Sequence, residues 1–327
     1  MVQRAAGLTR MRLCIVIVNY RTPGLVLDLL DSLEGQIEAG LDEIVVVDNG
    51  SGDGSAERLE RSIAARGLTR FCRVLRSDRN GGFSAGTNAG IRSADANFYL
   101  LLSSDTLVRK GAVLELLQQM QAHPGVGIAG PRIEWLDGTP QVSCYRDHSP
   151  VSELLTAARS SALDALLNSF HTALPVPEED CEVPWLSFAC VLIRREVIEK
   201  VGLLDEGYFM YFEDSDYCRA ARAAGFRVHY FPSAHVVHLR AGVSSVRSAP
   251  SSRGVRRKRE RRPRYVYASR TRYFRKGYGA VGLLAANALW YVGRSLAWGR
   301  ELVGRKVAHT HHREWLDNWT DAFRLQQ

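Results

Sequence analysis

The sequence predicts an α/β fold built on a mostly parallel sheet with helices on both faces. Over the first 130 residues, short apolar runs rich in β-branched residues, such as Leu13–Asn19 and Glu43–Asp48, alternate with segments of helical periodicity. Polar residues follow the ends of several strands, at 19–21, 48–49 and 103–105. Because ligands bind outside the carboxyl ends of parallel strands, the sequence places a nucleotide-sized site at this edge.

Each element follows from a local pattern. Strands are predicted where apolar runs lie between turn-forming residues, at 13–19, 43–48, 71–75, 98–102, 126–129, 183–193 and 227–231. Helices are predicted where apolar residues recur every three or four positions, at 25–37, 55–66, 83–93, 110–121, 195–201, 213–224, 265–276 and 278–304. Residues 151–167 carry a weaker helical pattern.

Composition limits the class of protein. The chain has 327 residues, of which 46% are hydrophobic and 24% are charged, the balance of a globular protein. None of the six cysteines forms a CxxC pair, which argues against a zinc ribbon or a disulfide framework and favours a reducing cytoplasm. We expect no signal peptide, since the N-terminal arginines precede only a short apolar run. The longest uncharged stretch, 277–293, is too short and glycine-rich for a secure transmembrane helix.

Charge is distributed unevenly along the chain. Residues 240–276 hold 14 Lys and Arg against one acid, Glu260, although the whole chain carries only +8. The preceding part is therefore acidic, and a strongly basic segment follows it. We expect 243–264 to form a mobile basic linker and 265–327 a helical extension. Such a segment fits an anionic membrane surface, and its lack of interleaved aromatics at 253–264 makes nucleic acid an unfavoured partner.

Two acidic features are candidates for chemistry. Asp105 ends an apolar strand, where a carboxylate can hold Mg²⁺ or Mn²⁺ against a diphosphate; the alternative is a helix cap. The stretch 208–216 runs from five bulky apolar residues into Glu213, Asp214 and Asp216. Partly buried carboxylates beside aromatics tend to have raised pKa values, which suits a general base. The alternative is an acidic first turn of a helix, which explains one acid better than three.

These features together resemble a family 2 glycosyltransferase of the GT-A fold, in the branch of bacterial rhamnosyltransferases and galactofuranosyltransferases. The resemblance rests on six stretches that follow in order: IVIVNYRT (15–22), IVVVDNGSGDGS (44–55), RNGGFSAGTNAGI (79–91), YLLLSSDT (99–106), the block 185–226 and HVVHLRAGVS (235–244). It implies a catalytic domain over 1–242, with a nucleotide-binding half at about 10–130 and an acceptor-binding half at 131–242.

The resemblance also implies roles for individual residues. Asp214, preceded by Glu213, matches the catalytic base, and Asp105 with His238 matches the ligands of a divalent metal, Mn²⁺ or Mg²⁺. The nucleotide would contact the set Asn19, Arg21, Asp48, Asn49, Asn80, Gly82, Asn88 and Ser104. The acceptor would contact Trp185, Asp216 and Arg219. The implied reaction moves a sugar, with inversion, from dTDP-rhamnose or a UDP-sugar to a hydroxyl of a glycan or lipid-linked acceptor of the cell envelope. The enzyme would lie on the inner face of the cytoplasmic membrane.

Two departures from the family pattern bear on this reading. Ser103 and Ser104 precede Asp105 where the family usually has another acid or Asn, which would weaken metal binding. Phe188 stands where family members commonly have glycine, and Cys190 follows it. Because phenylalanine is much larger than glycine, it would reshape the acceptor pocket. A catalytically silent adaptor with a GT-A-like domain is therefore one alternative. A nucleotidyltransferase is another, although residues 19–24 do not form the basic glycine-rich phosphate loop that it would need.

Overall fold

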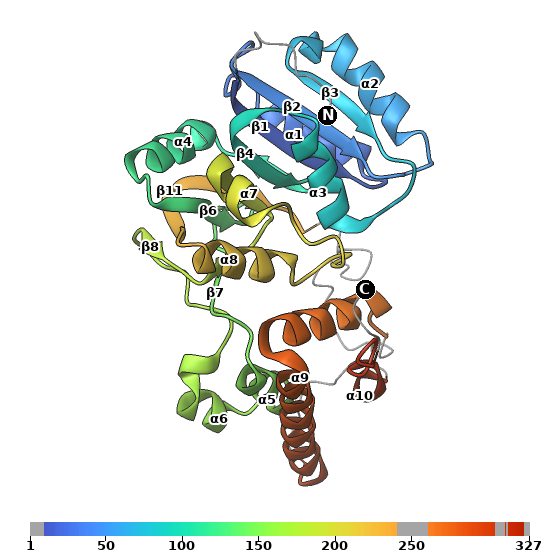
Figure 1. Cartoon of the computed structure of the whole chain (residues 1–327), viewed down its shortest axis with the longest axis vertical. Coiled ribbons are helices and arrows are strands. Elements are labelled where there is room, and N and C mark those ends of the chain that lie inside the picture. The colour runs from blue at the N-terminus through green and yellow to red at the C-terminus, as the bar shows by residue number, and fades with distance from the viewer. Residues whose placement is uncertain (1–9, 241–260, 305–310, 312, 324–327) are drawn as a thin grey trace.

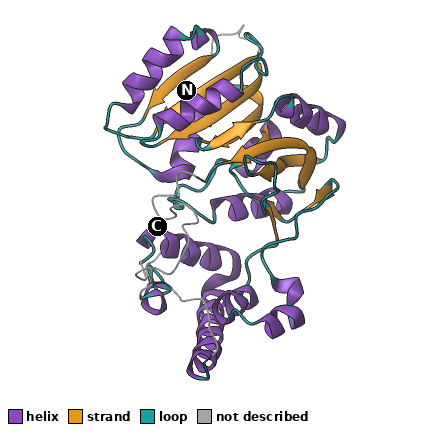
Figure 2. Ribbon diagram, turned by 180° about the vertical axis from the view of Figure 1, so that it is seen from behind, coloured by secondary structure: helices purple, strands orange, loops and turns teal. Residues whose placement is uncertain are grey.

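The computed structural model describes residues 10–240, 261–304, 311 and 313–323. An upper part contains the large sheet, and a lower part is made of helices (Figure 1). Seen from behind, the long strands all lie in the upper part (Figure 2). The predicted α/β class, with a mostly parallel sheet in its first half, is confirmed.

The first half of the sheet is parallel. Its strands are β1 (Met11–Asn19), β2 (Asp42–Asp48), β3 (Cys72–Arg76) and β4 (Ala96–Ser103), in the order β3-β2-β1-β4. The register pairs Asn19 with Asp48 and Val18 with Ser103. The polar ends of three strands therefore meet at one edge, as the sequence predicts.

An antiparallel strand joins this half to the rest of the sheet. Strand β10 (Cys190–Arg194) runs antiparallel to β4 and to β6 (Val126–Glu134), and β11 (Arg227–His238) runs parallel to β6. Strands β5 (Thr106–Val108) and β8 (Cys181–Glu182) pair antiparallel with β11. Because Cys190 pairs with Leu102 and His238 with Thr106, three distant segments reach the edge that holds Asp105.

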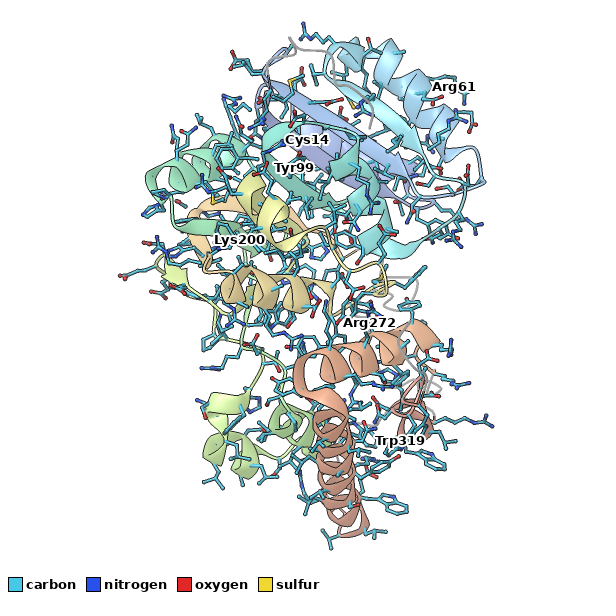
Figure 3. All side chains as sticks on the ribbon, in the orientation of Figure 1. Cys14, Arg61, Tyr99, Lys200, Arg272 and Trp319 are labelled. Atoms are coloured by element: carbon cyan, nitrogen blue, oxygen red, sulfur yellow. The ribbon has the colours of Figure 1, made fainter. Side chains whose placement is uncertain are left out.

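Helices cover both faces of the sheet. One face packs against α1 (Pro23–Ser32), α2 (Ser55–Ala65) and α4 (Ala112–Ala122). The other packs against α3 (Gly82–Arg92), α7 (Arg195–Val201) and α8 (Glu213–Ala223). All six cysteines, each within the described residues, are free thiols. In Figure 3, Cys14 and Tyr99 lie within this sheet, on neighbouring strands.

Two predicted elements are each divided into two in the structure. Residues 183–193 do not form one strand: β9 (Trp185–Leu186) pairs with β7 (Cys144–Tyr145), and β10 begins only at Cys190. The chain leaves a two-stranded ribbon and enters the large sheet here, so residues 187–189 form a loop at the edge. Residues 151–167 divide into α5 (Pro150–Ala158) and α6 (Ser161–Leu166). Short 3₁₀ turns occupy Leu68–Arg70 and Asn168–Phe170.

The lower part is organised around α9 (Arg264–Leu302). Non-helical backbone at Gly279 separates its two halves, in agreement with the two predicted helices. Helix α5 packs so closely on the distal half that a Cβ at Gly293 would overlap the carbonyl oxygen of Leu154. The short α10 (Glu314–Asp317) follows. Among the described helices, none combines the length and apolar character that crossing a bilayer requires.

Most of the predicted linker, including Arg256, Arg257, Lys258 and Arg259, lies outside the described residues. Its last residues are part of the folded chain, because α9 begins at Arg264. Arg261 pairs with Asp317, and Arg264 pairs with Asp321. These two arginines of the basic segment therefore connect the start of α9 to the C-terminal segment.

Candidate functional site

A cavity of about 350 Å³ opens at the carboxyl ends of β1 and β4. The end of β11, the loop before β10 and the segment before α8 complete its wall. Eight of the residues to which the resemblance gives a site role line it: Asn49, Asn80, Gly82, Ser104, Asp105, Glu213, Asp214 and His238. The fold thus brings together donor-side, metal and base candidates that are up to 189 residues apart in the chain.

Glu213 and Asp214 form the first turn of α8 and face this cavity. Burial raises the pKa of Asp214 to about 6, while the backbone N–H of Ser215 donates to its carboxylate at 2.8 Å. Burial, together with the negative charge of Asp214, raises the pKa of Glu213 well above its ordinary value. Both carboxyls of the pair therefore hold a proton more tightly than an ordinary carboxyl does.

The turn that leads into α8 has an unusual backbone. Tyr211 and Phe212 are consecutive non-glycine residues with left-handed φ values of 71° and 68°. Each such conformation costs on the order of 1–3 kcal/mol and persists where the surroundings hold it. Phe209, Met210 and Tyr211 line the cavity directly before the two carboxylates. The strained turn therefore sets how the acids enter the site.

An asparagine pair shapes the opposite wall. The amide of Asn49 donates to the side-chain oxygen of Asn80 at 3.0 Å and to the carbonyl of Gly82 at 2.9 Å. Gly82 has a φ of +86°, and a Cβ there would overlap the carbonyl oxygen of Phe209. The backbone N–H of Phe83 donates to that same oxygen at 2.7 Å. The glycine-rich loop is thus locked to the segment that carries the acids.

This contact predicts a large effect for Gly82→Ala. The methyl group would push away the 209–214 segment, so we expect loss of both stability and transfer activity. Gly111→Ala is the matched control, because Gly111 has nearly the same φ, +84°, with nothing within 4 Å of an added Cβ. Strain alone costs about 1–2 kcal/mol in both variants. Thermal unfolding and transfer activity are measured for both variants. Equal losses in Gly82→Ala and Gly111→Ala would show that the contact with Phe209 is unimportant.

The two candidate metal ligands, Asp105 and His238, lie close together. His238 Nε2 lies 3.4 Å from Asp105 Oδ1, and both side chains line the cavity. Thr22 donates to the hydroxyl of Ser104 at 3.1 Å, which places both hydroxyls on the same wall. Within the described ranges, no three His, Cys, Asp or Glu side chains gather into a metal-binding group. One carboxylate and one imidazole form a partial set that a ligand's oxygens would have to complete.

Asp48 lies beside this cavity in a second hollow at the ends of β2 and β3. Its carboxylate accepts from Asn19 Nδ2 at 2.7 Å and from the hydroxyl of Ser51 at 2.6 Å. Asn19 is fully buried and supports Asp48, and its contact with a nucleotide stays a prediction. Arg21 does not line the cavity either; it adopts a left-handed φ of 58°, and its Nε donates to the carbonyl of Ser51.

Asn88 is a second candidate whose side chain bonds within the protein. The sequence places it on the ribose–diphosphate region, but both ends of its amide are used inside the protein. Its Nδ2 donates to the carbonyl of Leu204 at 2.8 Å and to Glu206 at 3.0 Å, and its Oδ1 accepts from the N–H of Leu204 at 3.0 Å. The side chain is fully buried. Asn88 therefore fixes the 204–206 loop against α3.

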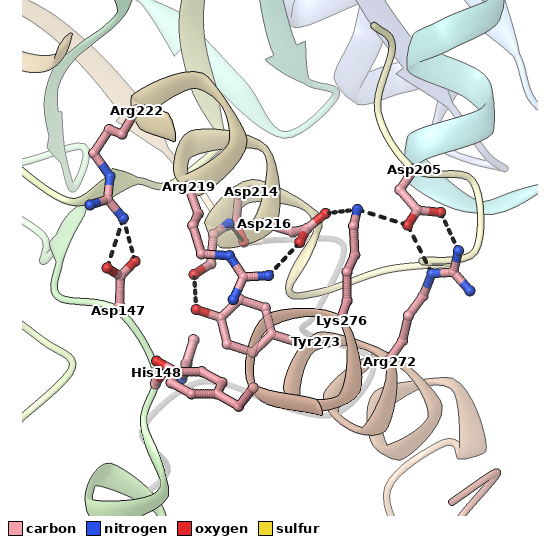
Figure 4. A network of polar contacts seen from close by, with 12 residues as sticks. Asp147, His148, Asp205, Asp214, Asp216, Arg219, Arg222, Arg272, Tyr273 and Lys276 are labelled. Atoms are coloured by element: carbon pink, nitrogen blue, oxygen red, sulfur yellow. Dashed lines mark hydrogen bonds and ion pairs between the residues drawn. The ribbon is translucent and has the colours of Figure 1, made fainter. Parts of the chain in front are cut away.

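The three predicted acceptor residues lie outside the cavity. Trp185 stacks on Tyr145 with ring centroids 4.1 Å apart, and its indole N–H donates to the carbonyl of Arg146. Asp216 and Arg219 pair with each other at 2.8 Å on the side of α8 that faces α9 (Figure 4). Helical geometry explains this, because residues 214 and 216 are about 200° apart around the axis.

Sequence reasoning missed several residues of the wall. Tyr20 and Thr22 follow β1, and Ser187 and Ala189 flank Phe188 in the loop before β10. Tyr20 lies within the polar strand end at 19–21 but received no role of its own, and the position of Thr22 just after it is a signal that could have found it. The 187–189 loop gives no such signal, since an apolar run through 183–193 hides the break between two strands.

Comparison with known proteins identifies the family. Residues 14–202 match the family described as glycosyl transferase family 2. Over 69% of its length the chain is 28% identical to the low-salt glycan biosynthesis hexosyltransferase Agl10 of Haloferax volcanii. Over 61% it is 30% identical to the N-acetylglucosaminyl-diphospho-decaprenol L-rhamnosyltransferase of Mycobacterium tuberculosis. In each case the match spans 66%, just under two thirds, of the relative's own length.

The fold has counterparts among solved structures. The crystal structure of GalNAc-T7 with UDP, GalNAc and Mn²⁺ superposes with a TM-score of 0.59 and 14% identity, over 91% of this chain and 56% of that one. This likeness shows the GT-A fold alone. The family match covers more than half of the chain, so the chain belongs to glycosyltransferase family 2.

Proposed function

We propose that this chain transfers a sugar, with inversion, from a nucleoside-diphosphate sugar to a hydroxyl of a glycan or lipid-linked acceptor in cell-envelope polysaccharide synthesis. One observation carries the proposal. Two adjacent carboxylates, the buried Glu213 and the half-buried Asp214, face a cavity at the carboxyl edge of a GT-A sheet. Family membership and the relatives named as hexosyl- and rhamnosyltransferases support the same reaction.

Asp214 is the proposed general base. Its raised pKa, about 6, makes it a better proton acceptor than an ordinary carboxylate while it is still ionised at neutral pH. The acceptor oxygen attacks the anomeric carbon as its proton passes to Asp214. The bond from that carbon to the phosphate oxygen breaks on the opposite face, and the nucleoside diphosphate leaves with the bonding electrons.

Asp105 and His238 are the proposed protein ligands of a divalent metal. Their carboxylate and imidazole lie on the cavity wall and suit Mn²⁺ or Mg²⁺ completed by diphosphate oxygens. When bound, such an ion supplies positive charge that stabilises the leaving diphosphate. Asn49, Asn80 and Gly82 form the opposite wall, where the loop would hold the donor.

Calorimetric titration of the purified protein tests the donor site. UDP, dTDP, GDP and CMP are each titrated with Mn²⁺ and with EDTA. We expect binding of one nucleoside diphosphate that weakens in EDTA, with dTDP or UDP as the ligand. Binding unaffected by EDTA would remove the metal from the proposal but keep the transferase. No binding of any of the four would favour a silent adaptor.

We further propose that the distal half of α9 rests on an anionic bilayer. Exposed apolar side chains follow one face of this segment: Val281, Leu284, Val292, Leu296 and Val303. The face extends about 33 Å at 1.5 Å per residue. Trp298 adds an exposed indole nearby. The basic segment 240–276 precedes it in the chain, and each basic residue near such a surface contributes about 1 kcal/mol.

Leu284→Asp is expected to weaken vesicle binding several-fold, because a carboxylate would enter both the apolar region and the field of anionic lipids. Leu114→Asp on α4 is the control, since Leu114 is 54% exposed and Leu284 51%. Flotation with phosphatidylglycerol vesicles at low salt gives the measurement. If the wild-type protein does not bind these vesicles, the proposed contact with a bilayer is wrong.

A further inference from the structure

The proximal half of α9 lies directly against the segment that carries the proposed base (Figure 4). Ser269 donates its hydroxyl to the carbonyl of Met210 at 3.0 Å. The phenol of Tyr273, fully buried, lies 3.3 Å from the hydroxyl of Ser215, the residue after Asp214. The helix that begins the C-terminal extension therefore contacts the active-site segment on both sides of the two acids.

Ion pairs hold the two ends of that segment. Asp205, before the strained turn, accepts two bonds from Arg272, at 2.9 and 2.8 Å. Asp216, in the first turn of α8, accepts from Arg219 at 2.8 Å. Lys276 joins the two, with its Nζ 3.1 Å from Asp205 and 2.5 Å from Asp216. One ammonium group thus ties together the start and the end of the segment that presents Asp214.

The protein is closely packed around the Asp205–Arg272 and Asp216–Arg219 ion pairs. A Cβ on Gly207 would overlap the guanidinium of Arg272, and a Cβ on Gly277 would overlap that of Arg219. Figure 3 places Arg272 at the junction between the sheet part and the helical part. The two glycines therefore leave room for the guanidinium groups that form these ion pairs.

Aromatic rings of α9 cover the strained turn between the anchors. Tyr265 stacks on Tyr211, with centroids 6.2 Å apart, and Tyr273 packs on Phe212 at 5.4 Å. Tyr211 and Phe212 are the two residues with left-handed backbone. Such strain is retained only where neighbouring structure fixes it. Within the described residues, α9 is an element that both clamps the ends of the turn and covers its middle.

From this geometry we infer that Lys276 is a positioning residue for the reaction: it holds Asp205 and Asp216 together so that the turn between them presents Asp214 to the acceptor. The inference rests on the proposed function. It assigns the C-terminal helix a part in activity beyond any attachment to a surface. Lys276 acts through the 205–216 segment and does not line the cavity.

Lys276→Met is the test variant, because methionine keeps much of the length and removes the charge. We expect kcat to fall roughly 10- to 100-fold, as for a small misplacement of a reacting group, with the donor KM within twofold. Lys276→Arg should recover most of kcat. Lys200→Met is the matched control, since Lys200 donates to the carbonyl of Ala224 at the far end of α8. Thermal unfolding verifies that each variant is folded.

A second measurement does not depend on activity. Hydrogen exchange of the amides of 205–216 should become faster in Lys276→Met and stay at the wild-type rate in Lys200→Met. If the wild-type protein transfers no sugar but Lys276→Met still exchanges faster over 205–216, the proposed function is rejected. The result would still show that Lys276 orders this segment. A variant with unchanged kcat and unchanged exchange, beside an active wild type, would overturn the positioning role alone.

Discussion

Asp214→Asn is expected to lower kcat about 10²- to 10⁴-fold, the range that a general base contributes, while donor affinity stays near the wild-type value. Asparagine keeps the shape of the side chain but has no oxygen that accepts the acceptor's proton. Its neighbours in the cavity, including Asp105 on the metal side, remain in place. Steady-state transfer at saturating substrates measures kcat, and calorimetry with the nucleoside diphosphate measures affinity.

The pH dependence adds a signature to this prediction. Because the pKa of Asp214 is about 6, the wild-type rate should rise as pH increases through 6, where the carboxylate becomes ionised. The free energy of unfolding changes with pH in the opposite direction to the rate. A carboxyl whose pKa is raised on folding loses stability as pH rises from its unfolded value of about 4 towards 6. Asp214→Asn should therefore be more stable than wild type at pH 8 and about equal to it at pH 4.

Asp28→Asn, on the exposed side of α1, is the control for the same chemical change. It should leave the rate and the stability difference between pH 4 and 8 unchanged. A rate for Asp214→Asn within tenfold of wild type would remove Asp214 as the base. In that case the neighbouring Glu213, whose carboxyl is also buried in the cavity wall, would be the next candidate.

Local patterns in the sequence were enough to predict the nucleotide-binding edge. Strands β1, β2 and β4 are continuous apolar runs, and a parallel sheet places their polar ends side by side without further information. Asp105 and Asp214 could be selected because each follows such a run or begins a helix. These features depend on residues adjacent in the chain, which is why they appear in the sequence.

The placements that the sequence did not predict depend on long-range contacts or on helical phase. Asp216 and Asp214 are two residues apart, yet one faces α9 and the other faces the cavity. Asn88 belongs to a motif typical of the site but is bound to residues 116 and 118 positions away. The role of Lys276 depends on packing between 205–216 and a helix about 60 residues later. No pattern within one segment contains this information.

The other large effect is expected for Arg270→Met, which should lower the free energy of unfolding by about 3–5 kcal/mol. Arg270 is 6% exposed, and its Nε donates to Glu153 of α5 at 2.8 Å. Its Nη1 donates to the side-chain oxygen of Asn287 at 2.7 Å, across the break at Gly279. Removing the guanidinium leaves a buried carboxylate without its ion-pair partner, and denaturant unfolding measures the loss.

Arg264→Met is the matched control on the same helix. Arg264 pairs with Asp321, but its side chain is 62% exposed, and exposed pairs contribute at most about 1 kcal/mol. In the double variant Arg270→Met with Glu153→Gln, the buried negative charge is gone, so part of the stability should return. Equal losses for Arg264→Met and Arg270→Met would contradict the importance of burial.

The Arg270 cluster also connects stability to activity. It fixes α9 to α5 between Ser269 and Tyr273, the two residues whose hydroxyls reach the active-site segment. If α9 positions that segment, loosening this contact should lower kcat even at temperatures where Arg270→Met is folded, and donor KM should change little. If α9 only stabilises the fold, the folded variant should keep the wild-type kcat. Activity well below the unfolding temperature separates a helix that supports the reaction from one that supports only the fold.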